Sequence, residues 1–373
     1  MNNTLSVIKK FIKKETVFTI AIILGIISCI IVPPTSDFFS YIDFRVLSIL
    51  FCLMLLVAGL KEQWIFRRLA EKLTAHVKGS MGLELILVLL PFFSSMLITN
   101  DVALITFVPF ALALLKGAGL EGRIIRVVVL QTIAANLGSM LTPIGNPQNL
   151  YLYTLSEMGF GTFLLTMLPL TIVSLVLLLI IVFTGKKTPI EVKFEKADVN
   201  ISKFKLTIIA ILFIISMGTV IRLIPWQISL IIVFISGLIW FRNLFKDIDY
   251  FLLGTFIGFF VFVGNMQKLP AINSFINNMV NGHELVGSTI ISQVISNVPA
   301  AMLLSGFTDN YVALLKGVDI GGLGTLIASM ASLISYKFYA VTPNSKKGKY
   351  ILTFTMWNLL FLAVLLMLEL IIM

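Results

Sequence analysis

Apolar segments without a single charged residue recur along the whole chain, and several exceed the roughly 17 residues that a helix needs to cross a bilayer. A lipid interior offers no hydrogen-bond partners, so such segments must be helices that satisfy their own backbone polar groups. Of the 373 residues 58% are hydrophobic and 12% are charged, whereas soluble domains carry about 25% charged residues. The pattern predicts an all-α integral membrane protein.

We expect about nine full membrane spans from this pattern. The first span is too long for a cleavable signal peptide and lacks a small-residue cleavage site. The predicted full spans are residues 16–33, 45–60, 124–152, 162–184, 206–222, 226–241, 249–266, 309–336 and 350–373.

Two further apolar segments, residues 81–116 and 284–306, are interrupted halfway by polar side chains. We expect each to be a re-entrant helical hairpin that turns near the midplane and leaves the membrane on the side it entered. Irregular backbone at that depth is tolerated only where protein or a water-filled cavity surrounds it. The polar residues at the turns are Ser94, Ser95, Thr99, Asn100 and Asp101 in the first segment and Ser292, Gln293, Ser296, Asn297 and Pro299 in the second.

The distribution of positive charge supports this layout. With the N-terminus inside, the cytoplasmic loops carry nearly all lysines and arginines, as the positive-inside rule requires. Hairpin 81–116 then faces the cytoplasm, hairpin 284–306 faces outside, and the C-terminus lies outside. The net charge of +10 therefore indicates a cytoplasmic membrane face and no nucleic-acid partner. The exceptions among the 28 basic residues are Arg45, Arg222, Lys268 and Lys316.

The chain is expected to consist of two related halves. A polar segment at 185–205, which contains Pro189, predicts a cytoplasmic linker between a first repeat, 1–184, and a connecting helix with a second repeat, 206–373. Thr99-Asn100 matches Ser296-Asn297, and Asn136-Leu-Gly-Ser-Met-Leu-Thr142 matches Asp319-Ile-Gly-Gly-Leu-Gly-Thr325. Matching motifs in halves of opposite orientation indicate an inverted-topology repeat; the alternative is two unrelated patches of small residues.

A discontinuous helix is predicted in each half, after the hairpin. Thr142-Pro-Ile-Gly-Asn-Pro-Gln-Asn149 cannot be a regular helix, because its two prolines remove backbone donors. Freed backbone groups in the membrane need partners, which favours a binding loop over a structural kink. The counterpart, from Gly321 through Thr325 to Ser332, has glycines in place of prolines and predicts a gentler break.

The two hairpin turns and the broken helices are expected to meet in one binding site. Small hydroxyl and amide side chains beside unpaired helix ends can replace the hydration shell of an ion, and half-helix N-termini present partial positive charge to an anion. Helix packing is the alternative role for Ser95 and Ser292. The predicted substrate-binding residues are Thr99, Asn100, Thr142, Asn146, Asn149, Ser296, Asn297 and Thr325.

Two carboxylates lie at membrane depth, where a charge is costly and marks a functional candidate. Asp101 is the first candidate for a proton or cation site, or it caps the second hairpin limb. Asp319 follows Lys316 at the spacing of an i,i+3 pair, which is either functional or a satisfied ion pair. The predicted coupling-ion residues are Asp101, Ser95, Ser292 and Asp319, with transient sodium at Asn100, Asp101 and Asn297 and with no permanent metal or cofactor.

These motifs resemble the ion transporter superfamily, which includes divalent-anion:sodium symporters, citrate transporters, arsenite pump membrane subunits and some sodium/proton antiporters. The resemblance rests on Leu97-Ile-Thr-Asn-Asp-Val-Ala-Leu104, Leu141-Thr-Pro-Ile-Gly-Asn-Pro-Gln-Asn149 and Ser292-Gln-Val-Ile-Ser-Asn-Val-Pro-Ala300. It implies binding of the substrate carboxylate at the two tips, a homodimer and elevator-type movement of the hairpin domains. Asp101 and Val298 replace the third residue of the family's Ser-Asn-Thr triplet, which argues against dicarboxylate transport with several sodium ions.

The sequence thus predicts a multi-pass plasma-membrane protein that carries out sodium- or proton-coupled secondary transport of a small anion, a di- or tricarboxylate or an inorganic oxyanion. The chain has no nucleotide-binding G-x-x-x-x-G-K-[ST] run. A sodium/proton antiporter without organic substrate is the alternative. More remote alternatives are an intramembrane aspartyl protease that uses Asp101 and Asp319, and a passive channel. Lipid, the anion and a second copy of the chain are the expected partners.

Overall fold

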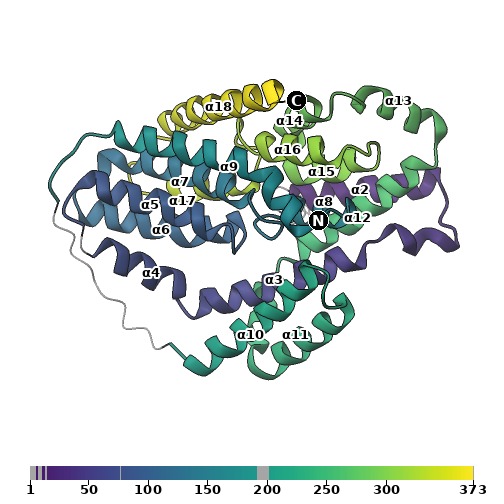
Figure 1. Ribbon diagram of the computed structural model, residues 1–373, viewed down its shortest axis with the longest axis horizontal. Helices are drawn as coiled ribbons and strands as arrows, with labels where there is room; N and C mark the ends of the chain where they lie inside the picture. Colours follow the sequence, from purple (N-terminus) through teal and green to yellow (C-terminus); the bar gives the residue numbers. More distant parts are fainter. Residues whose placement is uncertain (1–5, 7–10, 13–14, 76, 191–200, 373) are drawn as a thin grey trace.

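The computed structural model describes residues 6, 11–12, 15–75, 77–190 and 201–372. Helices account for nearly all regular structure in this part of the chain (Figure 1). Those of the first half are α2 (Thr16–Ile31), α3 (Phe44–Glu62), α4 (Ile65–Thr74), α5 (Ser80–Ser94), α6 (Asn100–Gly117), α7 (Ile124–Ser139), α8 (Pro147–Leu155) and α9 (Phe160–Phe183). Those of the second half are α10 (Lys203–Val220), α11 (Trp226–Trp240), α12 (Tyr250–Gln267), α13 (Pro270–Val280), α14 (Glu284–Ile295), α15 (Asn297–Ser305), α16 (Tyr311–Gly321), α17 (Met330–Ala340) and α18 (Lys347–Ile372).

The predicted all-helical membrane protein is confirmed. Six helices, α3, α6, α9, α10, α12 and α18, are long and apolar enough to cross a membrane, and α2, α5, α11 and α14 are shorter apolar helices. Most of their outward side chains are aliphatic or aromatic, as a lipid-facing surface requires. The number of full spans and the sidedness of the termini stay predictions.

Both interrupted segments break where the sequence predicts. The first breaks between α5 and α6, over residues 95–99. The second breaks at one residue, Ser296, between α14 and α15. Ser296 has a φ of 77°, a left-handed backbone conformation that is strained for a residue other than glycine. Polar turn residues thus end one helix and begin the next within an apolar segment.

The two predicted discontinuous helices are also present. Residues 140–146 separate α7 from α8, and residues 322–329 separate α16 from α17. The expectation of a gentler break in the second half is wrong, because its glycines interrupt the helix over a segment of similar length. Gly324 explains this, since its φ of 98° is open to glycine and rare for other residues.

The same set of helix contacts occurs twice. In the first half α5 and α6 form the hairpin and both pack on α7; in the second half α14 and α15 do the same on α16. The contacts also cross between halves: α17 packs on α6 and α7, while α8 packs on α15 and α16. Each hairpin therefore packs on the first part of the discontinuous helix of its own half (α7 or α16). It also contacts the second part of the discontinuous helix of the other half (α17 or α8).

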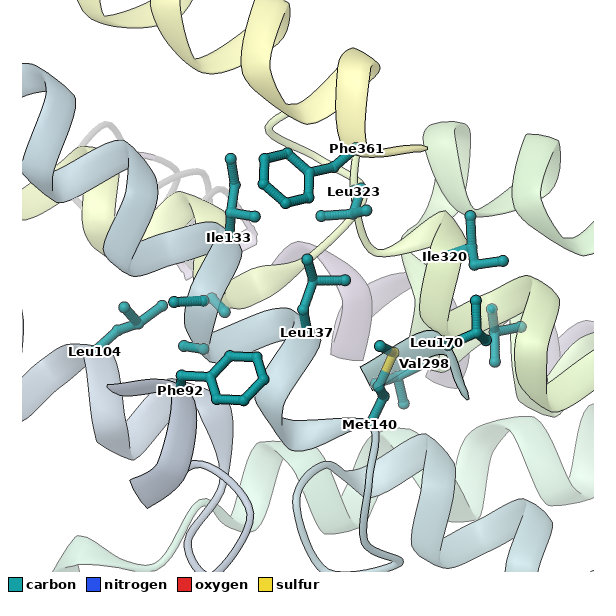
Figure 2. Close-up of a cluster of buried hydrophobic side chains, with 14 of the residues drawn as sticks. Phe92, Leu104, Ile133, Leu137, Met140, Leu170, Val298, Ile320, Leu323 and Phe361 are labelled. Carbon is teal, nitrogen blue, oxygen red and sulfur yellow. The ribbon is translucent and has the colours of Figure 1, made fainter. Parts of the chain in front are cut away.

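Apolar side chains from both halves fill the centre of this arrangement (Figure 2). Leu137 of α7, Met140 directly after it, Val298 of α15 and Ile320 of α16 are buried members of this one cluster. Burial of such side chains contributes roughly 1.5–3 kcal/mol each when the alternative is water. In a membrane the outer apolar side chains contact lipid and not water, so their burial gives little driving force for helix association. Close packing of this core therefore contributes more to holding the helices around the breaks together.

Helices α3, α10 and α11 form a separate packing unit at the edge of the molecule (Figure 1). Between α3 and α5 lies the amphipathic helix α4, which packs on α5 and α6. On the opposite side α2 packs along α12, where Gly25 lies against the backbone of Gly258 and lets the two helices approach closely.

The start of the predicted linker is attached to the first hairpin. Ser80 N–H donates to the Thr188 carbonyl at 2.9 Å, and Ile190 N–H donates to the Lys78 carbonyl at 3.1 Å. The predicted cytoplasmic linker extends over residues 191–200, which lie outside the described residues. Its role as the boundary between two halves stays a prediction.

Candidate functional site

The first hairpin turn is held by Asn100, the first residue of α6. Its backbone N–H donates to the Gly145 carbonyl at 3.1 Å, in the break between α7 and α8. Its side-chain Nδ2 donates to Asn136 Oδ1 of α7 at 2.9 Å. Its Oδ1 accepts the Asp101 N–H at 2.9 Å, which satisfies one of the free donors at the start of α6. One buried amide thus joins the hairpin turn to the broken helix.

The second turn repeats this geometry. The Asn297 N–H donates to the Ala328 carbonyl at 2.9 Å, in the break between α16 and α17. Its Oδ1 accepts the Val298 N–H at 3.0 Å. Asn297 is 5% exposed, as is Asn100. The match predicted between Thr99-Asn100 and Ser296-Asn297 is therefore a match of hydrogen bonds as well as of residue types.

One threonine in each break of the discontinuous helices bonds to the hairpin of its own half, Thr142 to the first turn and Thr325 to limb α14. Thr142 Oγ1 donates to the Met96 carbonyl at 2.5 Å, and Thr325 Oγ1 donates to the Gln293 carbonyl at 3.1 Å. Thr142 is half-buried, whereas Thr325 is exposed. Both hydroxyls already donate their hydrogen to a backbone carbonyl, so each hydroxyl oxygen could only accept a hydrogen bond from a ligand or coordinate a cation.

Ser95 is the first residue after α5 and Ser292 lies one turn before Ser296, and both are in the contact between a hairpin and the discontinuous helix of its half. Each hydroxyl donates to a carbonyl of its own helix, Ser95 to Phe92 at 3.0 Å and Ser292 to Ser288 at 2.7 Å. Each also faces a glycine of the facing helix: the Ser95 hydroxyl lies close to Gly138, and Ser292 lies close to Gly321. This position agrees with helix packing, and the coupling-ion role of both serines stays a prediction.

The two halves also bind each other through equivalent positions. Asn136 Oδ1 accepts Ser329 Oγ–H at 3.1 Å, at the start of α17. At the corresponding place of the second half, Asp319 Oδ1 accepts the Asn146 amide at 3.4 Å, at the start of α8. Each broken helix therefore contacts the N-terminal end of the other. The polar centre is a continuous network that includes residues from both halves.

Asp319 is the centre of the less complete part of this network. Its Oδ1 also accepts Gln148 Nε2 at 3.2 Å, and the Asn149 side chain is within reach of the carboxylate. Its Oδ2 is buried and has no hydrogen-bond partner among the described residues. The predicted Lys316–Asp319 pair is wrong: Lys316 Nζ binds Glu369 of α18 at 2.6 Å. The i,i+3 spacing allows an ion pair within α16, but Lys316 binds a carboxylate on the neighbouring helix α18 instead.

Asp101 lies in the first turn of α6, half-buried beside Asn100. The alternative that it caps this helix is wrong, because Thr99 occupies the N-cap position. Its carboxylate makes no hydrogen bond or ion pair with any other described side chain. A negative group at this place interacts favourably with the helix N-terminus. Asp101 therefore stays a candidate for the coupling ion.

Asn146 and Asn149 both belong to the start of α8. Asn146 is the N-cap: its Oδ1 accepts the Asn149 N–H at 2.9 Å, and Pro147 follows at the first helical position, where proline is favoured. Asn149 Nδ2 donates to the Met140 carbonyl at 3.2 Å. Its Oδ1 is a second buried acceptor without a partner in the described part of the chain.

Residues outside the predicted set also belong to the network: Asn136, Ser139, Gln148, Gln293, Ser329 and Ser332. Gln293 Nε2 donates to the Gly321 and Leu323 carbonyls, each at 2.9 Å, which satisfies the end of α16. The repeat alignment pairs Asn136 with Asp319, and that pairing was the signal that could have added Asn136 to the site. Gln148 gave no such signal, because its partner lies in the other half.

No group of three or more His, Cys, Asp and Glu side chains that could hold a metal occurs in the described ranges. The centre consists of neutral amides, hydroxyls and two carboxylates. Such groups bind a small polar ligand or a monovalent cation through many weak contacts, as a transported species requires for release.

Comparisons with known proteins point to one kind of protein. A family model described as citrate transporter matches residues 5–319. An uncharacterized transporter of Methanocaldococcus jannaschii is 29% identical over 343 residues, 90% of this chain and 92% of the relative. The inner membrane protein YbiR of Escherichia coli is 28% identical, over 86% of this chain and 87% of its own. The silicon efflux transporter LSI3 of Oryza sativa is 32% identical over 40% of this chain and 31% of its own.

Proposed function

The chain belongs to the citrate transporter family, and from that premise we propose that it carries out cation-coupled secondary transport of a small anion at the central polar network. It is a transporter and no enzyme, and it lies in the membrane. The observation that carries the proposal is the pair of equivalent turns, in which Asn100 and Asn297 each donate the backbone N–H to a helix break and accept the N–H of the next residue on Oδ1.

The duplicated geometry supports an inverted repeat, with one hairpin open to each side of the membrane. Two helix breaks, each bound to its own hairpin, meet near the centre and expose helix ends to one ligand. The hairpin domains move relative to the unit of α3, α10 and α11 in an elevator-type cycle, and two chains associate as a homodimer. Alternating access rather than a continuous pore follows from turns that approach from opposite sides.

The anion class comes from the site and from the relatives together. Amide and hydroxyl donors beside helix N-termini suit an oxygen-rich anion or oxyacid. The family model is described as citrate transporter and one relative as a silicon efflux transporter. These descriptions support tricarboxylates and inorganic oxygen acids as the first candidate substrates. Sodium or a proton drives the transport, through Asp101, Asp319 or the amides Asn100 and Asn297.

The test is uptake into proteoliposomes. Citrate, succinate, phosphate, sulfate, arsenite and silicic acid are supplied separately under an imposed sodium or proton gradient. One of these compounds should accumulate only with a gradient, and Asn100→Ala and Asn297→Ala should each remove accumulation. Glu62→Gln, an exposed residue outside the site, should leave it unchanged. Exchange of sodium for protons with no accumulated compound would replace the proposal by the antiporter.

A further inference from the structure

We infer that Asp319 carries the coupling proton, which it holds on Oδ2 in a pocket of neutral amides. This inference deepens the proposed function, on which it rests for the coupling, although its central measurement does not require transport. The starting observation is a difference between equivalent positions: the first half has an amide, Asn136, where the second half has a carboxylate, Asp319.

The two oxygens of Asp319 have different surroundings. Oδ1 accepts amide hydrogens from Asn146 and Gln148. Oδ2 is buried. Among the described residues it has no hydrogen-bond partner, and no cation lies within ion-pair distance of it. A buried ionised carboxylate needs a compensating partner for each oxygen. A proton on Oδ2 removes the charge and leaves the two hydrogen bonds to Oδ1 intact.

The amide lining makes this proton exchangeable. An arginine or lysine beside the carboxylate would hold it permanently ionised. Amides carry both donors and acceptors, so Asn146, Gln148 and Asn149 can serve the protonated and the ionised carboxyl group in turn. The proton binds Oδ2 from water on one side of the membrane and leaves to water on the other, with no other bond made or broken.

The other titratable groups around α16 are already engaged. Lys316 of the same helix pairs with Glu369 of α18 at 2.6 Å. Glu284, at the start of α14, accepts Thr308 Oγ1–H at 2.9 Å. Arg126 of α7 pairs with Glu84 at 2.6 Å.

The two tyrosines of α8 are engaged in the same way, and the remaining titratable side chains of α16 and α18 lie at the starts of these helices. On α8 Tyr151 bonds Ser305 at 2.7 Å and Tyr153 donates to the Val220 carbonyl at 3.0 Å. Tyr311 begins α16, two turns before Asp319. Lys347, Lys349 and Tyr350 belong to the first turn of α18, and α15 carries no titratable side chain. No fixed charge therefore competes with the proton.

A sodium ion fits this position less well. Sodium needs several oxygen ligands, and the described residues offer Asp319 Oδ2 with amide nitrogens, Asn146 Nδ2 and Gln148 Nε2, turned toward the same carboxylate. Nitrogen donors repel a metal ion. The proton requires only one oxygen.

The experiment is infrared spectroscopy of the purified full-length protein in detergent, in sodium-free buffer, during a titration from mildly acidic to mildly alkaline pH. The wild type should show the carbonyl stretch of a buried protonated carboxyl group, and labelling with carboxyl-¹³C aspartate should shift it. Asp319→Asn should remove the band, Asp319→Glu should move it, and Asp101→Asn and Glu62→Gln should retain it.

Each result decides the inference. An absent band in the wild type, a band that survives Asp319→Asn, or one that sodium removes at constant pH overturns it. The isotope shift with Asp101→Asn decides the case even where Asp319 variants do not fold. If the wild type transports none of the tested anions but shows the band, the proposed function fails and the protonated Asp319 stands. If anion uptake is found but the band is absent, the proposed function stands and the protonated Asp319 is overturned.

Discussion

The first and second halves of the site have the same framework and different chemistry. Asn136 in the first half is satisfied on both sides of its amide, by Asn100 and Ser329 on Oδ1 and by Ser332 on Nδ2. Asp319, at the equivalent place, leaves one oxygen without a partner. The comparison teaches that the backbone contacts of the two turns can be duplicated while the side chain at one equivalent position differs, an amide in the first half and a carboxylate in the second.

The largest expected difference concerns the buried glutamates near the open end of each hairpin. Glu84 pairs with Arg123 at 3.1 Å and Arg126 at 2.6 Å, and both arginines also donate to backbone carbonyls near the predicted linker. Glu84→Gln should lower the free energy of unfolding by about 3 kcal/mol, because two half-buried arginines lose the counter-charge that the buried glutamate supplies.

Glu284 offers the matched control in the second half, since it accepts a hydroxyl hydrogen from Thr308. Glu284→Gln keeps an acceptor and should cost about 1 kcal/mol or less. Thermal unfolding in detergent compares the two variants. Equal losses would contradict the interpretation that only the first hairpin is fixed by an ion pair.

Alanine substitutions at Gly138 and Gly321, the glycines on which the hairpin limbs pack, should differ less in their effect on the free energy of unfolding. A Cβ at Gly138 would lie 2.0 Å from the Phe92 carbonyl oxygen, whereas one at Gly321 would lie 2.7 Å from the Ser292 side chain. Both contacts require the packed hairpin limb to shift, because Ser292 Cβ is fixed to its backbone, and the overlap at Gly138 is the larger one. Gly138→Ala should therefore destabilise by about 3 kcal/mol and Gly321→Ala by about 1. Detergent-induced unfolding measures both, and a larger loss for Gly321→Ala would refute the stated clash.

The donors that cross between the halves provide a sharper comparison. Gln148→Met removes a donor to Asp319, and Ser329→Ala removes a donor to Asn136. If Asp319 carries a proton, both are neutral hydrogen bonds and each variant should lose about 1 kcal/mol.

Thermal unfolding at mildly acidic pH measures this pair. A loss for Gln148→Met that exceeds that for Ser329→Ala by about 2 kcal/mol would indicate an ionised carboxylate, since hydrogen bonds to charged groups are stronger. The pair therefore tests the difference between the halves without any transported ligand.

The smallest expected effect is at the two threonines that tie breaks to limbs. Thr142→Val removes a 2.5 Å hydrogen bond in a half-buried place, and Thr325→Val removes a 3.1 Å one in an exposed place. We expect a loss of about 0.6 kcal/mol for Thr142→Val and less for Thr325→Val. Unfolding midpoints of the two variants and the double variant measure this, and an order of effects opposite to the burial would contradict it.

Much of the site could be predicted from local sequence. The interruptions at Ser95–Asn100 and at Ser296 are visible because polar residues are costly inside an apolar segment. The prolines around Asn146 mark a helix break for a backbone reason that needs no tertiary contact. The alignment of the two halves also placed Asn136 opposite Asp319.

Partner choice could not be predicted in the same way. Lys316 and Asp319 have the spacing of an ion pair, yet Lys316 binds Glu369, which lies far along the chain. Gln148 donates to Asp319 across the boundary between the halves, and helix α4 joins the α3 unit to the first hairpin. Sequence spacing predicts which residues can contact each other within one helix. It does not predict whether a residue on another helix is the preferred hydrogen-bond or ion-pair partner.

The sequence by itself determined that the chain is helical and membrane-embedded, where its helices break, and which residue types gather at the breaks, because hydropathy and backbone chemistry act locally. Only the tertiary structure decided which amide meets which carboxylate and which oxygen remains without a donor. Those facts depend on how α8 and α17 each pack into the opposite half, and that packing is set by the combined shape of helices distant in sequence.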